Sequence, residues 1–154
     1  MLAAALRSFE HHYAQLNGRR SVLYPGVREG LTALRSRGVR LACVTNKPAR
    51  FTQPLLARFD LAQDFDAVVS GDTVARKKPD PEPVLAACRL LGVAIADAVM
   101  IGDSANDALA ARAAGCRVLL LPYGYAEAGA VQDIDCDGIV ESLLHAAQVP
   151  ALWS

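Results

Sequence analysis

Apolar and polar positions follow two periods along this chain, one typical of strands and one typical of helices. Short continuous apolar runs predict buried strands at 39–44, 65–69, 98–101 and 118–121. Apolar residues three and four apart, often with a glycine at the end, predict helices over 27–37, 48–59, 81–91, 104–114 and 139–147. Strands and helices that alternate in this way favour an α/β fold, with a Rossmann-like, mainly parallel sheet as the middle of three layers.

The start of the chain has the spacing of an amphipathic helix. This helix is predicted over residues 2–16 and would end before Asn17 and Gly18. Residues 21–25 follow as a connector that closes on Pro25 and Gly26.

Composition narrows the class of protein. The chain has 154 residues, 53% of them hydrophobic, which suits a single domain with a real core. Lys plus Arg and Asp plus Glu balance at 16 each, so neither nucleic acid nor a membrane surface is expected as a partner. No apolar run reaches the length of a membrane span. Four scattered cysteines without a Cys-x-x-Cys motif are expected to be free thiols in a cytoplasmic protein.

Two polar clusters could bind an anion. Thr45, Asn46 and Lys47 follow the predicted strand at 39–44, where a hydroxyl and backbone N–H groups can cradle a phosphate. Lys78 precedes Pro79, which favours an extended backbone from which a cationic side chain can project. Each cluster has a structural alternative, because Thr-Asn often caps a helix and Lys-Lys-Pro often forms a solvated loop.

A third cluster offers oxygen ligands. Asp103 follows the predicted strand at 98–101, and Asp107 lies in the first turn of the next helix. Two carboxylates at the carboxyl edge of a sheet suit Mg²⁺, although Gly-Asp-Ser before a helix can also be a capping motif.

Taken together, the three clusters resemble a known family. Val44-Thr-Asn, Lys78-Pro79 and Gly102-Asp-Ser-Ala-Asn-Asp107 are similar to motifs two, three and four of the haloacid dehalogenase superfamily of phosphatases, nearest to its phosphoglycolate phosphatase branch. The resemblance implies Mg²⁺-dependent hydrolysis of 2-phosphoglycolate, or of another small phosphomonoester such as a sugar phosphate, through an aspartyl-phosphate.

The resemblance also implies a role for each site residue. Thr45 would bind the transferring phosphoryl group, and Asn46 would orient it. Lys78 would offset negative charge, Asp103 would hold Mg²⁺, and Asp107 would support that metal.

One expected motif is absent. The family's first motif, Asp-x-Asp-Gly-Thr, carries the nucleophile and does not occur in this sequence. By this resemblance, residues 1–24 are a remnant of a helical cap with its connector, and residues 25–154 are the core domain. The strand that carries the motif is then missing from the sheet centre. The flanking strands would close up, a second chain would fill the gap by strand swapping, or the fold would be marginal. Asp133-Ile-Asp135 has the lettering of the motif but is expected to be a polar turn.

Two function hypotheses follow. One is a phosphatase whose sequence begins late, through truncation or a misplaced start, with a small phosphorylated metabolite as its partner. The alternative is a non-catalytic module that binds phosphate or metal, or a partner subunit. A homodimer or a strand-swapped partner fits either hypothesis.

Overall fold

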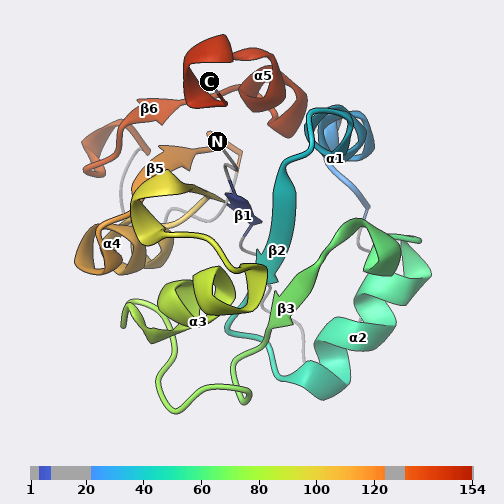
Figure 1. The fold of residues 1–154 in the computed structure, drawn as a ribbon, viewed down its shortest axis with the longest axis vertical. Helices are drawn as coiled ribbons and strands as arrows, with labels where there is room; N and C mark the ends of the chain where they lie inside the picture. The colour runs from blue at the N-terminus through green and yellow to red at the C-terminus, as the bar shows by residue number, and fades with distance from the viewer. Residues whose placement is uncertain (1–3, 8–21, 124–130, 154) are drawn as a thin grey trace.

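A six-stranded parallel sheet forms the centre of the protein. The computed structural model describes residues 4–7, 22–123 and 131–153. The strands run in the order β3-β2-β1-β4-β5-β6 (Figure 1). Their bounds are β1 Ala4–Arg7, β2 Arg40–Val44, β3 Ala67–Val69, β4 Ala98–Gly102, β5 Arg117–Leu120 and β6 Gly138–Ile139. This order and direction confirm the predicted Rossmann-like class.

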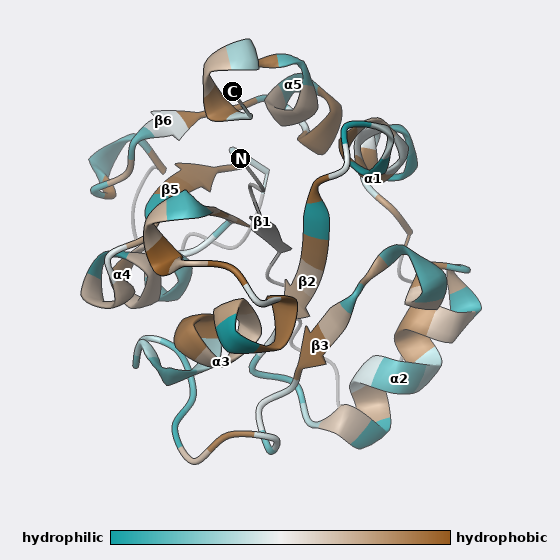
Figure 2. Ribbon diagram, in the orientation of Figure 1, coloured by the Kyte–Doolittle hydropathy of each residue, from teal (hydrophilic) through white to brown (hydrophobic). Residues whose placement is uncertain are grey.

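Helices cover both faces of the sheet. They are α1 Val27–Ser36, α2 Ala49–Arg58, α3 Glu82–Leu91, α4 Ala105–Ala114 and α5 Leu143–Gln148. Figure 1 shows α3 and α4 on one side of the sheet and α1, α2 and α5 on the other. Successive side chains of β2 point to opposite faces of the sheet. Leu41 and Cys43 pack in the hydrophobic core on the side of α1, whereas Ala42 and Val44 pack in the core on the side of α3. The apolar residues of the central strands, brown in Figure 2, therefore supply two cores.

The long helices form where the hydrophobic spacing predicts them. In α1, Val27, Leu31 and Leu34 are buried one turn apart. Gly92 and Gly115 end α3 and α4 in the left-handed conformation, with φ of 65° and 84°, which a glycine adopts without strain. No helix in the described ranges has the length and hydropathy to cross a membrane.

The prediction of a helix at the start of the chain is wrong for residues 4–7. These residues form β1, which pairs with β2 on one side and β4 on the other. Arg7 lies opposite Cys43 and Ile101. The chain's own segment thus occupies the sheet centre that we expected to lack a strand. Pairing along both edges of β1 outweighs the helical propensity of its alanines. The remainder of the expected helix, residues 8–16, lies outside the described residues.

The end of the chain also differs from the prediction. The helix expected over 139–147 begins only at Leu143, after Ser142, whose hydroxyl accepts a hydrogen bond from the His145 amide at 3.0 Å. Gly138–Ile139 instead pairs with β5. A strand of two residues is too short to produce a recognisable period.

An ion-pair cluster stabilises the edge of the sheet formed by β5 and β6. Arg112 on α4 contacts Asp135 at 3.1 Å and Asp137 at 2.9 Å. Asp137 also accepts a hydrogen bond from the Val118 amide of β5 at 2.7 Å. The Asp133–Asp137 segment, expected to be a polar turn, therefore fastens β6 to α4 and β5.

The first prediction concerns β1. Ala5→Pro removes a backbone N–H from a strand that is paired on both sides, and it leaves a carbonyl of a neighbouring strand unsatisfied. We expect a loss of about 1–3 kcal/mol in the free energy of unfolding, measured by urea denaturation. Ala94→Pro is the matched control, since Ala94 is exposed and its φ of −72° already suits proline. Equal stability of the two variants would mean that β1 does not complete the sheet.

The second prediction concerns pH. Burial alone would raise the pKa of Asp137, but hydrogen bonds from the Val118 amide and from Arg112 lower it below its usual value. A carboxylate with a lowered pKa stabilises the fold above its unfolded pKa of about 3.9, and this contribution disappears as the pH falls through the folded pKa. Asp137→Asn is therefore expected to lower the melting temperature at neutral pH, with a difference from wild type that shrinks below about pH 4. Asp133→Asn is the matched control, because Asp133 lies nearby but is not part of the Arg112 ion-pair cluster, and it should leave the melting temperature at neutral pH close to that of wild type.

Candidate functional site

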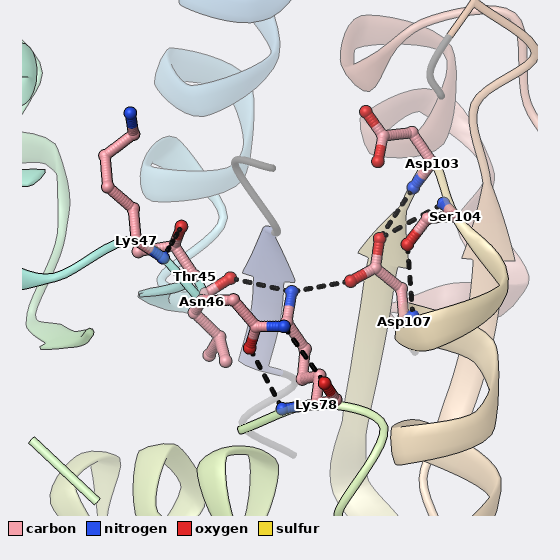
Figure 3. Close-up of polar contacts among 8 residues, drawn as sticks. Thr45, Asn46, Lys47, Lys78, Asp103, Ser104 and Asp107 are labelled. Atoms are coloured by element: carbon pink, nitrogen blue, oxygen red, sulfur yellow. Dashed lines mark hydrogen bonds and ion pairs between the residues drawn. The ribbon is translucent and has the colours of Figure 1, made fainter. Parts of the chain in front are cut away.

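The candidate site lies at the carboxyl edge of the sheet, where the strand order reverses. Thr45 directly follows β2 and Asp103 directly follows β4. These two strands flank β1, and Figure 3 shows the end of β1 between the Thr45 and Asp103 loops. Crevices at such a reversal are where open α/β sheets bind ligands.

Lys78 reaches this edge from the loop between β3 and α3. Its ammonium donates to the Val44 carbonyl at 3.3 Å and to Asp107 Oδ1 at 2.6 Å. Neither the Lys78 nor the Asp107 side chain has any exposed surface. The ion pair therefore joins the end of β2 to the first turn of α4 in the protein interior, where each charge depends on the other.

Asp107 holds the turn that carries Asp103. Its Oδ2 accepts hydrogen bonds from the Asp103 amide at 2.9 Å and the Ser104 amide at 3.2 Å. Ser104 Oγ accepts in return from the Asp107 amide, which completes a capping box. A Cβ at Gly102 would lie 2.6 Å from Asp107 Cγ, so the glycine is needed for this close approach.

The two carboxylates that the sequence assigned to a metal thus occupy different environments. Both oxygens of Asp107 accept hydrogen bonds from the protein. Asp103 is only partly buried, and Figure 3 shows its carboxylate turned away from Asp107. Asp103 is therefore the residue placed to contact a cation, whereas Asp107 fixes the backbone on which Asp103 stands.

Thr45 and Lys47 form the opposite side of the site. Thr45 is buried, and its Oγ1 accepts a hydrogen bond from the Lys47 amide at 3.1 Å. The Thr45 amide donates to the Val69 carbonyl at 2.9 Å, which ties the turn to β3. In Figure 3 the Lys47 side chain extends to the same side as the Thr45 hydroxyl. Burial lowers the pKa of Lys47, which the sequence placed in the anion-binding cluster without assigning it a role of its own.

Asn46 contacts Lys78 through its side-chain amide. Asn46 Nδ2 donates to the Lys78 carbonyl at 3.0 Å, and the Lys78 amide donates to Asn46 Oδ1 at 2.9 Å. The Lys78–Pro79 peptide bond is cis. Asn46 thus joins the Thr45 turn to the Lys78 loop, which the sequence analysis treated as two separate candidate anion-binding clusters.

The donor set suits a cation that retains part of its hydration shell. Within the described residues, no group of three or more His, Cys, Asp or Glu side chains could hold a metal ion. Mg²⁺ is usually bound by one or two carboxylates together with waters and the phosphate of a ligand. The partly buried Asp103 carboxylate, at the same edge of the sheet as the Thr45 turn, fits that pattern.

The third prediction tests the ion pair. Lys78→Met leaves the Asp107 carboxylate buried without its cation, so we expect a loss of about 3–5 kcal/mol in the free energy of unfolding. Combining it with Asp107→Asn removes that charge and keeps an acceptor for the two amides of the turn. We therefore expect the double variant to be more stable than Lys78→Met alone in urea unfolding. A double variant that is less stable would contradict the dependence of each charge on the other.

Comparison with known proteins shows which family this chain resembles. A family model for haloacid dehalogenase-like hydrolases matches residues 2–115. A phosphoglycolate phosphatase of Nitrosospira multiformis is 50% identical over 149 residues, which are 97% of this chain and 66% of that protein. A crystal structure of a predicted phosphoglycolate phosphatase from Haemophilus somnus superposes with a TM-score of 0.81 at 35% identity, over 86% of this chain and 59% of that one.

A second similar structure was solved with a ligand. CbbY from Rhodobacter sphaeroides, solved in complex with phosphate, has a TM-score of 0.72 at 29% identity, over 83% of this chain and 57% of that one. The chain thus spans two thirds or less of the length of each of these relatives. The match to the family model and the shared fold show that this chain belongs to the haloacid dehalogenase-like hydrolases.

Proposed function

We propose that this chain forms the phosphate- and magnesium-binding part of a phosphatase active site that acts on small phosphomonoesters, with 2-phosphoglycolate as the first candidate. The observation that carries the proposal is the convergence of three loops on the buried Lys78–Asp107 pair. This convergence holds the Thr45 turn and the Asp103 turn on either side of β1.

Each residue has a role that follows from its chemistry. The Thr45 turn presents a hydroxyl and backbone N–H groups to phosphoryl oxygens. Lys47 adds positive charge next to the Thr45 turn, and Lys78 adds it at the end of β2, where it is paired with Asp107. Asp103 would hold Mg²⁺, which offsets the negative charge of the phosphate when it is bound. Asp107 keeps the Asp103 backbone in place through its two amide contacts.

The substrate class rests on the relatives. The Nitrosospira protein is named a phosphoglycolate phosphatase, and the CbbY structure contains phosphate. A phosphomonoester with a small organic part is therefore the ligand to test first.

The sequence itself favours a second candidate function. It contains no Asp-x-Asp-Gly-Thr segment, which in this family provides the nucleophile for the aspartyl-phosphate. A chain with the other three motifs would bind phosphate and a divalent cation without turning over a phosphomonoester. Binding and hydrolysis must therefore be measured separately.

The fourth prediction concerns binding. We expect calorimetry to detect inorganic phosphate binding that strengthens when Mg²⁺ is present. Thr45→Val and Asp103→Ala should each weaken it about tenfold, as expected for the loss of one hydrogen bond or ligand to a charged group. Thr32→Val, on the exposed face of α1, is the matched control and should leave the affinity unchanged. Absence of any heat at millimolar phosphate with Mg²⁺ would refute both candidate functions.

Hydrolysis then separates the two candidates. If the purified chain releases phosphate from 2-phosphoglycolate faster than its Asp103→Ala variant, the phosphatase assignment holds for this chain itself. If phosphate binds but no release exceeds that of the variant, the non-catalytic module is the correct description.

A further inference from the structure

Lys78 is a buried residue in an exposed loop. Across residues 75–79, Lys78 alone is buried, while its neighbours Lys77 and Pro79 are exposed. The loop therefore gains little from packing on either side of Lys78. Glu82 holds the loop just before Lys78 by accepting hydrogen bonds from the Ala75 and Arg76 amides. The position of Lys78 itself then depends on contacts at its own backbone and at its ammonium group.

The backbone contact is a pair of hydrogen bonds from one side chain. Asn46 accepts from the Lys78 amide at 2.9 Å and donates to the Lys78 carbonyl at 3.0 Å (Figure 3). The planar side-chain amide of Asn46 therefore holds both the backbone N–H and the backbone C=O of Lys78. These two contacts fix the Cα of Lys78 in position and in orientation. The ammonium lies at the end of four methylene groups, and a fixed Cα limits the arc through which it can move.

The residue that provides this contact is itself held firmly. The backbone of Gly71 packs so closely on the Asn46 peptide that a Cβ at position 71 would lie 2.7 Å from the Asn46 carbonyl carbon. The Gly71 amide donates to the Lys47 carbonyl at 2.9 Å, and Asp72 accepts from the Ala49 amide at 2.8 Å. The two loops are therefore joined at several points, and at one of them the Asn46 side chain contacts the Lys78 backbone.

We propose that Asn46 is a positioning residue that fixes Lys78, and through it the ammonium at the sheet edge, instead of contacting the ligand itself. The expected effect of Asn46 on phosphate binding rests on the proposed function, in which Lys78 binds the anion. The effect of Asn46 on the position of Lys78 is independent of that function. The family resemblance assigned Asn46 to the phosphoryl group directly, so the two roles give different results when Asn46 and Lys78 are changed together.

The fifth prediction is a double-variant comparison of phosphate affinity. Asn46→Ala should weaken phosphate binding about tenfold. Lys78→Gln, which keeps an N–H group for Asp107 and the Val44 carbonyl, should weaken it as well. If Asn46 acts only through Lys78, the double variant should bind within about twofold of Lys78→Gln alone. Additive losses in the double variant would show that Asn46 contacts the ligand, and would overturn the proposal.

A second measurement needs no ligand. Acetic anhydride modifies accessible lysine amines, and the exposed Lys77 provides an internal standard beside the buried Lys78. In Asn46→Ala, the rate of Lys78 modification relative to Lys77 should rise about tenfold by mass spectrometry. In Asp72→Ala, which breaks a contact between the same two loops away from Lys78, the ratio should stay within about twofold of wild type.

The two measurements keep the proposals distinguishable. If wild-type protein does not bind phosphate, the proposed function fails, and the modification ratio still decides the role of Asn46. If the ratio is unchanged in Asn46→Ala, or rises equally in Asp72→Ala, Asn46 does not position Lys78. If the ratio rises only in Asn46→Ala, the positioning role stands whatever the activity of the chain.

Discussion

The ion pair between Lys78 and Asp107 determines how the three loops of the site meet. Both side chains are fully buried, and removing either would leave a charge in an apolar interior. The pair also contacts backbone groups: Lys78 donates to the Val44 carbonyl, and Asp107 accepts from the Asp103 and Ser104 amides. One electrostatic contact thus sets the relative position of the end of β2 and the start of α4.

This arrangement separates residues that build the site from residues that face a ligand. Asp107, Gly102 and Asn46 act on other protein groups, and their contacts are short and largely buried. Asp103 and Lys47 are partly buried, as Asn46 is, and their side chains extend from the ends of β4 and β2. Preorganisation of this kind means that little conformational entropy is lost when an anion or a cation binds.

Much of the fold could be predicted from the sequence because its long elements carry strong local signals. The buried stripe of α1 and the glycines after α3 and α4 are examples. β1 could not be predicted, because Ala-Ala-Leu-Arg favours a helix by propensity and only pairing with two distant strands makes it extended. The positions of Thr45 and Asp103 at one edge followed from the ends of the predicted strands, whereas Lys78 lies in a long loop and was assigned to the site by the family resemblance. The contact of Asn46 with Lys78 did not, because no local pattern reports which of two loops a side-chain amide will reach.

The place of β1 in the sheet has a consequence for how the protein folds. Its two partners come from the early and the late parts of the chain, so the middle of the sheet closes only when both have collapsed. Such non-local pairing slows folding and makes the two apolar cores form in one cooperative event. During synthesis β1 can pair with β2 early, but its other edge stays open to other strands until residues 98–102 have left the ribosome and β4 can pair with it.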